Sequence, residues 1–264
     1  PLEQEDYKPA RKEFEKLIKA YKDSWEAPEA QYYIGRCRVE EGEYYKGFLA
    51  YRKTIQTYPS STRFDEILER AYQIGNHFLA GKKRKLLGTA AILPARDKAV
   101  EIFLAIVEDG PFSEYGVLAQ YKLGVAHMSL HDFEQAVQAF EQVISRYPES
   151  ELVDDARFQI AQASLKGTFE SDYDQAPTEL AERELELFLR EYPESELTEE
   201  ATERLEALRE RQAKHNFEVA AFYEERQQPD SAIIYYEQVV QEFGDTSVAP
   251  EAAARIEVLL QTAN

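Results

Sequence analysis

The apolar and polar positions along the chain follow the pattern of helices arranged in pairs. Five helical runs each carry a small residue followed four positions later by a large apolar residue: Gly47/Tyr51, Ala99/Phe103, Ala136/Phe140, Ala181/Leu185 and Ala232/Tyr236. Residues four apart lie on one face of an α-helix. On that face the small residue lets a neighbouring helix approach closely, and the large residue fills the space that results.

A second set of small residues lies upstream of these runs, in Ile34-Gly35, Ile74-Gly75, Leu123-Gly124, Ile160-Ala161 and Val219-Ala220. Related turns follow the runs: YPSS at 58–61, GPFS at 110–113, YPESEL at 147–152 and 192–197, and FGDT at 243–246. In two units, 28–59 and 117–148, the relative spacing of these residues resembles that of a tetratricopeptide repeat. Such a helix pair cannot bury its apolar face alone, so it stacks on its neighbours.

The repeats predict an all-α fold, a tetratricopeptide-repeat (TPR) α-α superhelical solenoid of about five helix pairs. A partial unit at 6–25 would precede the pairs, and a capping helix at 248–262 would follow them. The full pairs are expected at about 28–59, 68–111, 117–148, 154–193 and 197–244.

Three local features are expected within this arrangement. The first helix of the last pair runs without a breaker over about Thr198–Gln227. Ser150 and Ser195 are the expected N-caps of the helices that follow the two YPESEL turns. The second helices of the pairs at 68–111 and 154–193 start twelve and eight residues late, so each pair is expected to carry a loop insertion.

Composition narrows the class of function. The chain has 264 residues, 44% of them hydrophobic and 31% charged, which suits a sizeable core. Its 50 acidic residues exceed its 31 basic ones, so a nucleic acid partner is not expected, because phosphate binding needs a basic face. No apolar run approaches the roughly 18 residues of a membrane span. The chain begins at Pro1 without a basic and apolar leader, so a targeting segment would have been removed or never existed.

Residues that carry chemistry are few. His127 and His131 have a spacing that suits a metal on one helix. However, His131 falls where the repeat turns, so we expect the rings to diverge and His127 to pack in the core. Cys37 lies between Arg36 and Arg38, which could lower its pKa, but a buried small apolar residue is the preferred interpretation. No serine–histidine–acid set, glycine-rich phosphate loop or HExxH motif occurs, so no enzyme activity, cofactor or metal is expected.

The C-terminal part of the chain has a more specific resemblance. Its long helix carries the run AKxxFxVAxFYxER at Ala213–Arg226, and a repeat with an acidic insertion and the turn YPES precede that helix. These features resemble the last repeats of the BamD family, also called ComL or YfiO, which are TPR lipoproteins of the outer-membrane β-barrel assembly machinery. The resemblance covers roughly residues 63–262. It predicts extra TPR units at 1–60 and a BamD-like TPR solenoid at 61–264, as one continuous structural domain.

The resemblance implies a non-enzymatic scaffold at the periplasmic face of the bacterial outer membrane. Its C-terminal repeats would bind the periplasmic domains of the barrel-inserting outer-membrane protein, and its N-terminal repeats would receive unfolded barrel substrates. Other assembly lipoproteins are further expected partners. Membrane contact would be only through a lipidated N-terminal cysteine, and no cysteine stands near Pro1. Two alternatives stay open: a periplasmic TPR protein of the cell-envelope or division machinery, and a cytoplasmic peptide-binding TPR adaptor.

The candidate binding residues form three groups. First helices line the concave side of such a solenoid, where an extended peptide could lie against Tyr32, Tyr33, Tyr72, Gln73, Asn76 and Tyr121. By family resemblance, a partner domain would dock on the charged and aromatic surface of Arg209, Arg211, Lys214, Tyr223, Glu225 and Arg226. The basic loop consists of Lys82, Lys83, Arg84 and Lys85. Core packing and solvated ion pairs are the plainer interpretations of the first two groups. The loop either faces water or contacts an anionic surface.

Overall fold

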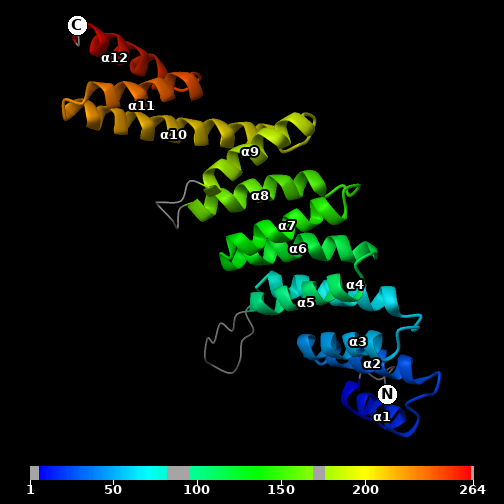
Figure 1. The fold of residues 1–264 in the computed structure, drawn as a ribbon. Coiled ribbons are helices and arrows are strands. Elements are labelled where there is room, and N and C mark those ends of the chain that lie inside the picture. The colour runs from blue at the N-terminus through cyan, green and yellow to red at the C-terminus, as the bar shows by residue number, and fades with distance from the viewer. Residues whose placement is uncertain (1–5, 82–94, 169–175, 263–264) are drawn as a thin grey trace. The chain divides into compact units, whose positions relative to one another are not determined.

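Helices account for all regular structure in residues 6–81, 95–168 and 176–262, the parts of the chain that this computed structural model describes (Figure 1). They are α1 (Tyr7–Ala20), α2 (Ala27–Glu40), α3 (Tyr44–Thr57), α4 (Phe64–Leu79), α5 (Ala95–Asp109), α6 (Glu114–Leu130), α7 (Phe133–Arg146), α8 (Val153–Thr168), α9 (Ala176–Glu191), α10 (Thr198–Glu225), α11 (Pro229–Glu242) and α12 (Ala249–Thr262). This confirms the predicted all-α class.

Two compact units divide the chain, unit 1 at Pro1–Ser171 and unit 2 at Asp172–Asn264. Unit 1 holds α1 to α8, and unit 2 holds α9 to α12. The predicted extra TPR units at 1–60 and the predicted solenoid at 61–264, expected to form one continuous structural domain, remain predictions.

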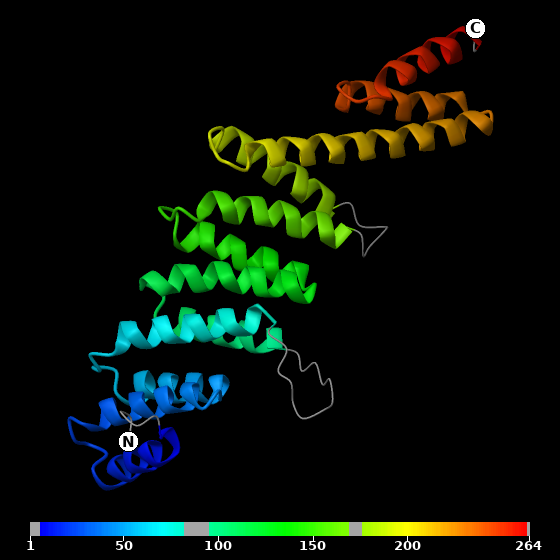
Figure 2. The same ribbon diagram turned by 180° about the vertical axis from the view of Figure 1, so that it is seen from behind.

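Unit 1 is a stack of antiparallel helix pairs (Figures 1 and 2). Each helix from α1 to α7 packs on the next one in the chain, and further contacts of α3 with α5 and of α4 with α6 join neighbouring pairs. The pairs α2/α3, α4/α5 and α6/α7 lie close to their predicted bounds, with α1 alone in front of them. The repeat pattern therefore predicted these pairs correctly.

Close approach of paired helices depends on glycine at matching positions, which include Gly35 and Gly124. A Cβ at Gly35 of α2 would lie 2.5 Å from a ring carbon of Tyr51, and a Cβ at Gly124 of α6 would lie 2.6 Å from ring carbons of Phe140. Carbon atoms in ordinary contact are about 3.5–4.0 Å apart. Both rings are almost completely buried and have no room to move aside. The small-against-large packing that the sequence predicts is confirmed.

Buried glutamines tie first helices to second helices in the same two pairs. The Gln31 side chain of α2 donates to the backbone carbonyl of Ala50 over 3.3 Å, and the Gln120 side chain of α6 donates to that of Ala139 over 2.9 Å. Both glutamines are 4% exposed, so an unmade hydrogen bond there would leave a desolvated amide. The two pairs thus repeat a polar contact as well as an apolar one.

The serines of the YPESEL turns are not helix N-caps, so that prediction is wrong. The helix α8 begins at Val153, and the N-cap of α10 is Leu197. The hydroxyl of Ser150 accepts the backbone N–H of Leu152 over 3.2 Å, and the hydroxyl of Ser195 accepts that of Leu197 over 3.3 Å. Each serine therefore closes an additional turn of chain before its helix starts.

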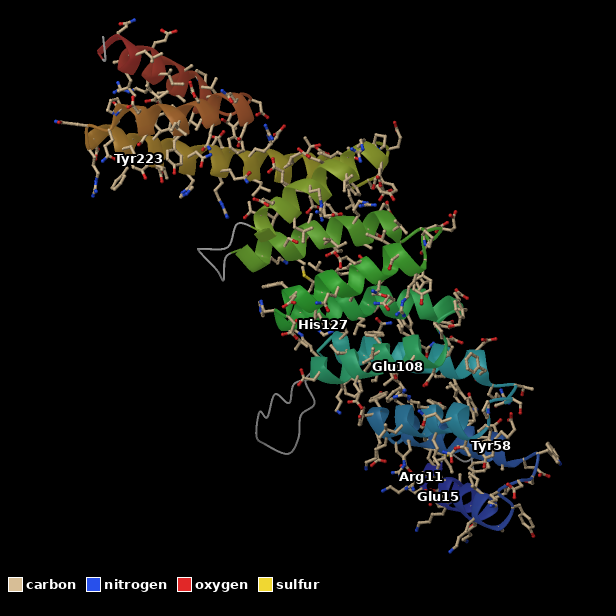
Figure 3. The ribbon with its side chains drawn as sticks, in the orientation of Figure 1. Arg11, Glu15, Tyr58, Glu108, His127 and Tyr223 are labelled. Atoms are coloured by element: carbon tan, nitrogen blue, oxygen red, sulfur yellow. The ribbon has the colours of Figure 1, made fainter. Side chains whose placement is uncertain are left out.

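Tyrosines at these turns bind the turn of the preceding pair. The Tyr58 hydroxyl donates to the carbonyl of Lys22 over 3.2 Å, and the Tyr147 hydroxyl donates to the carbonyl of Pro111 over 2.8 Å. Both bonds join residues 36 positions apart. They hold successive turns of unit 1 together at the edge where Figure 3 labels Tyr58.

Unit 2 is built on one long helix. In it α9 packs on α10, α10 on α11, and α11 on α12. The predicted uninterrupted helix is confirmed as α10, and it ends before Gln227, whose φ of 58° turns the chain toward α11. Ala220, Ala232 and Tyr236 form part of a core that α10, α11 and α12 share.

The two predicted insertions fall between α4 and α5 and between α8 and α9. The helix α4 ends at Leu79 and α5 begins at Ala95, whereas α8 ends at Thr168 and α9 begins at Ala176. The basic loop residues, Lys82 to Lys85, lie outside the described residues, and so does most of the second insertion. The orientation predicted for the basic loop therefore stays open.

Candidate partner-binding surfaces

Alternate helices of unit 1, which are α2, α4, α6 and α8, form one side of its stack, and we call this side the first-helix face. Tyr32 of α2 was expected on it, but its ring is 2% exposed. Its hydroxyl donates to Glu66 of α4, and the guanidinium of Arg63 lies 5.0 Å from the centre of its ring. Burial, followed by the Glu66 carboxylate, raises the pKa of Tyr32 to about 12. Tyr32 is therefore a core residue that offers no surface to a partner, which corrects its place among the binding residues.

The other residues predicted on α2 and α4 are at least partly exposed. Tyr33 of α2 is half-buried and stacks on Phe14 of α1 with ring centres 5.5 Å apart. On α4, Tyr72 is half-buried beside Tyr115 of α6 at 5.8 Å. Gln73 is exposed and Asn76 half-buried. The structure thus brings aromatic edges and amide groups together along two neighbouring first helices.

The α6 part of the first-helix face is acidic. Tyr121 is half-buried against Phe140, with ring centres 5.3 Å apart. Burial, followed by the carboxylate of Asp155 on α8, raises the pKa of Tyr121 to about 12. Burial and the neighbouring Asp154 also raise the pKa of Asp155. The carboxylates of Asp154 and Asp155 on α8 therefore lie near the ring of Tyr121.

Two arginines of the first-helix face were not among the predicted binding residues. Arg36 lies one helical turn after Tyr33, and Arg70 lies one turn before Gln73. Both arginines are exposed. The spacing of three residues from predicted groove positions was a signal in the sequence that these side chains share the same face.

On unit 2, the predicted docking residue Arg209 is engaged within the protein. Arg209 of α10 donates to Asp245 over 2.9 Å, to Glu182 of α9 over 3.1 Å and to the carbonyl of Glu242 over 2.8 Å. Its guanidinium lowers the pKa of Asp245. Arg209 therefore fastens α9 and the end of α11 to the long helix, which matches the plainer interpretation of an ion pair.

Lys214 and Tyr223 also have partners within unit 2. Lys214 pairs with Glu210 at 3.0 Å, and the same carboxylate accepts the backbone N–H of Ser247 over 2.9 Å. The ring of Tyr223, which Figure 3 labels, stacks on the ring of Tyr235 of α11 with ring centres 5.5 Å apart and an angle of 10° between the planes. These contacts stabilise unit 2 whether or not a partner binds.

The remaining predicted docking residues are exposed, and two exposed apolar residues of α10 and α11 were not predicted. Arg211 and Glu225 lie at the surface of α10, and Arg226 lies exposed at its C-terminal cap. The guanidinium of Arg226 lies 4.2 Å from the ring centre of Phe222, which is 48% exposed, and Ile234 of α11 is 56% exposed. Phe222 belongs to the AKxxFxVAxFYxER run, so the sequence contained the signal for it.

Candidate chemical groups behave as structural residues. Cys37 is fully buried, as expected, and burial followed by the charge of Glu41 raises the pKa of its thiol. His127 is half-buried with Nδ1 3.5 Å from Asp132, whereas His131 is exposed and ends α6 with a φ of 65°. Within the described ranges, no three potential ligands lie together in a way that could hold a metal ion. No helix in the same ranges is long and apolar enough to span a bilayer.

A family model described as outer membrane lipoprotein, YfiO, matches residues 95–261. The chain belongs to this family. The match extends over both units and lies within the range of 63–262 in which the resemblance was expected. A tetratricopeptide-repeat model matches residues 29–61, which hold most of α2 and all of α3. The predicted family and the predicted TPR fold are both confirmed.

Several solved structures resemble the chain. A tetratricopeptide repeat protein from Parabacteroides merdae is 12% identical, with a TM-score of 0.39 over 98% of this chain and 94% of that one. A thermophilic TPR protein from Thermus thermophilus is 14% identical, with a TM-score of 0.39 over 76% of this chain and 90% of that one. No curated protein matches in sequence. The TPR assignment rests on the repeat match and the helix pairs.

Proposed function

We propose that this YfiO family protein is a non-enzymatic scaffold of the machinery that assembles outer-membrane β-barrel proteins. It acts at the periplasmic face of the outer membrane and holds the periplasmic domains of the barrel-inserting protein on unit 2. The observation that carries the proposal is the family match over residues 95–261, which includes nearly all of the described part of unit 2. The absence of any catalytic arrangement in the sequence agrees with a role in binding.

The exposed surface of α10 and α11 supports the docking role. Phe222 places an apolar ring at the surface against Arg226, Ile234 is exposed on α11, and Arg211 and Glu225 add charges of both signs. Aromatic and arginine side chains are enriched among residues that dominate interface energies. We therefore assign Phe222, Ile234, Arg211, Glu225 and Arg226 to the docking surface. Arg209, Lys214 and Tyr223 instead hold that surface in shape through their partners within unit 2.

Co-purification with the periplasmic domains of the barrel-inserting protein tests this role. The full chain is expected to form a stable complex, and Arg211→Glu/Arg226→Glu is expected to weaken it at least about tenfold, the effect of about 1.4 kcal/mol. The matched control, Lys53→Glu/Arg146→Glu, makes the same change in net charge at exposed positions of α3 and α7. It should leave the complex intact. Absence of a complex with the unmodified chain would overturn the proposal in favour of another envelope or adaptor role.

Unit 1 has the second part of the proposed function, which is to receive unfolded barrel segments. The partly exposed aromatic and amide side chains of Tyr33, Tyr72, Gln73 and Asn76 support this part. An extended chain has free backbone N–H and C=O groups that amide side chains can bind. Binding of unfolded barrel segments to the full chain, measured by fluorescence anisotropy, tests it. Loss of affinity in Tyr72→Ala, with Tyr58→Ala as the control at the turn edge, is the expected result.

A further inference from the structure

Helix α1 lies at the N-terminal end of unit 1 (Figure 1) and turns a row of lysines to the solvent. Its apolar side packs on α2, where Ala10 is buried and the ring of Phe14 stacks on that of Tyr33 with ring centres 5.5 Å apart. The lysine row consists of exposed side chains three or four positions apart: Lys8, Lys12, Lys16 and Lys19. This spacing keeps the lysines on one face of the helix, on the side opposite to Ala10 and Phe14.

Much of this positive charge is not neutralised within the protein. In α1 and the turn after it, residues 7–26, six basic and four acidic side chains give a net charge of +2, whereas the whole chain has −19. Two of the acids are already paired: Glu15 with Arg11 at 2.9 Å, both labelled in Figure 3, and Glu13 with Lys16 at 2.7 Å. Among the described residues, no carboxylate lies within ion-pair distance of Lys8, Lys12 or Lys19. These three lysines can therefore meet an anion from outside the molecule.

Two aromatic side chains are exposed in the turn that follows the lysine row. Tyr21 is 67% exposed and Trp25 is 81% exposed. The turn is held in shape, because the backbone N–H of Ser24 donates to the carbonyl of Tyr21 over 3.1 Å and the Tyr58 hydroxyl donates to the carbonyl of Lys22 over 3.2 Å. Aromatic rings with a polar group favour the boundary between water and the acyl chains of a bilayer.

The combination of lysines with exposed aromatic rings favours a bilayer surface over an acidic protein as the occupant. Protein–protein interfaces are depleted of lysine and enriched in arginine. The one arginine of α1, Arg11, is engaged within the fold, since it pairs with Glu15 and lies 3.5 Å from Glu41 of α2. Lysine side chains are long enough to reach headgroup phosphates while their stems cover apolar surface. Anionic headgroups attract lysines near the surface, and helices that lie on bilayers commonly combine lysine with tryptophan.

We propose that the lysine row of α1 and the turn after it bind the surface of a bilayer that contains anionic phospholipid. The lysines contact headgroup phosphates, and the rings of Tyr21 and Trp25 enter the interfacial layer. The packing of α1 on α2 is retained, because the lysine row lies on the other side of the helix. This contact adds to the lipid anchor, which the family resemblance gave as the only membrane contact. It does not depend on the partner of unit 2.

The fluorescence of Trp25, the chain's only tryptophan, tests the inference directly. The full chain is titrated with vesicles of phosphatidylcholine and phosphatidylglycerol in equal parts, and with vesicles of phosphatidylcholine alone. The anionic vesicles are expected to shift the emission to shorter wavelength and to protect Trp25 from quenching by acrylamide. Co-sedimentation is expected to show binding at least about tenfold tighter to the anionic vesicles than to the neutral ones. Added salt should weaken this binding, because salt screens exposed charges.

Matched variants separate the lysine row from the net charge of the chain. Lys8→Gln/Lys12→Gln/Lys19→Gln is expected to bind the anionic vesicles at least about tenfold more weakly, since each basic residue near the surface adds to the attraction. The control makes the same change in net charge at exposed positions of α3, α7 and α8, with Lys53→Gln/Arg146→Gln/Lys166→Gln. It should bind as the unmodified chain does.

The aromatic part of the surface has a control of its own. Trp25→Ser is expected to weaken co-sedimentation with the anionic vesicles, whereas Phe112→Ser should leave it unchanged, although Phe112 is 99% exposed in a turn, 110–113, that has no basic residue. Equal binding to the two kinds of vesicle, or full binding by the lysine variant, would overturn the inference. Absence of binding to the anionic vesicles would also overturn it, in favour of an acidic protein surface as the occupant of the lysine row. The co-purification experiment on unit 2 tests the scaffold role separately.

Discussion

Substitution of Gly124 by alanine tests the packing on which each helix pair depends. The new methyl carbon would lie 2.6 Å from two ring carbons of Phe140, about 1 Å inside ordinary contact. Phe140 is fully buried in α7. Overpacking of this kind costs about 1–3 kcal/mol, and removal of a helical glycine returns about 0.5–1 kcal/mol. A net loss of about 1–2 kcal/mol is expected for Gly124→Ala.

A double-mutant cycle separates this steric effect from other consequences of the change. Phe140→Leu alone is expected to lower the free energy of unfolding by about 1–2 kcal/mol. This is less than the about 3–5 kcal/mol lost when a buried phenylalanine is replaced by alanine, because leucine fills most of the space. In the double variant the smaller side chain makes room for the methyl group. We therefore expect a combined loss smaller than the sum by about 1–2 kcal/mol, within the range of couplings between contacting residues.

Urea unfolding followed by far-ultraviolet circular dichroism measures these losses. Tryptophan fluorescence is unsuitable, because Trp25, the chain's only tryptophan, is 81% exposed in the turn before α2. Gly167→Ala is the matched control, since its new Cβ would lie 3.7 Å from the Cβ of Phe133, in ordinary contact. It should cause no loss. A stabilised Gly124→Ala variant, or losses that add within about 0.5 kcal/mol, would refute the packing argument.

Three further predictions concern charge and burial. Hydrogen bonds from Lys46 and Arg38 lower the pKa of Glu43 from 4.5 to about 2. The contribution of Glu43 to the stability of the fold is therefore present above about pH 4.5 and lost as the pH falls toward 2. Glu43→Gln should reduce the drop in melting temperature between pH 6 and pH 3. Arg209→Ala should lower the melting temperature of the chain by several degrees, because Arg209 fastens α9 and the end of α11 to α10, whereas Lys53→Ala, at an exposed position of α3, should change it by less than about 1 °C. The thiol of Cys37, fully buried and with a raised pKa, should react with Ellman's reagent at least about a hundredfold more slowly in the native chain than in urea.

The helix pairs were predictable because several positions of each repeat constrain the same register. Three features fix the register of a repeat: a small residue in the first helix, a small residue followed four positions later by an aromatic residue in the second, and a proline in the turn. These features agree in the pairs that contain Gly35 and Gly124. The long helix α10 was predictable for a different reason, since no proline or glycine interrupts it. The N-caps were not, because Ser150 and Ser195 serve a turn that starts before the helix.

The candidate sites were less predictable because exposure depends on residues far away in the sequence. Tyr32 and Tyr33 are adjacent, yet only Tyr32 lies in the core, where Glu66 accepts its hydroxyl. Likewise, Arg209 and Arg211 both occur on the long helix, but the partners of Arg209 come from α9 and from the end of α11. Helical periodicity places a residue on a face. It does not tell which neighbouring helix covers that face.

Contacts between successive repeats join residues at a regular separation in the sequence, and this separation helps to predict which side chains are used within the fold. In unit 1, the bonds of Tyr58 and Tyr147 to the preceding turns both join residues 36 apart, and in unit 2 Arg209 meets Asp245 at the same separation. Once the repeat register is known, a side chain that has a complementary group about one repeat away is expected to be used within the fold. Arg36 forms no ion pair with any described residue, although its helix is part of a regular pair. A charge that the register leaves without a partner is therefore the better candidate for binding another molecule.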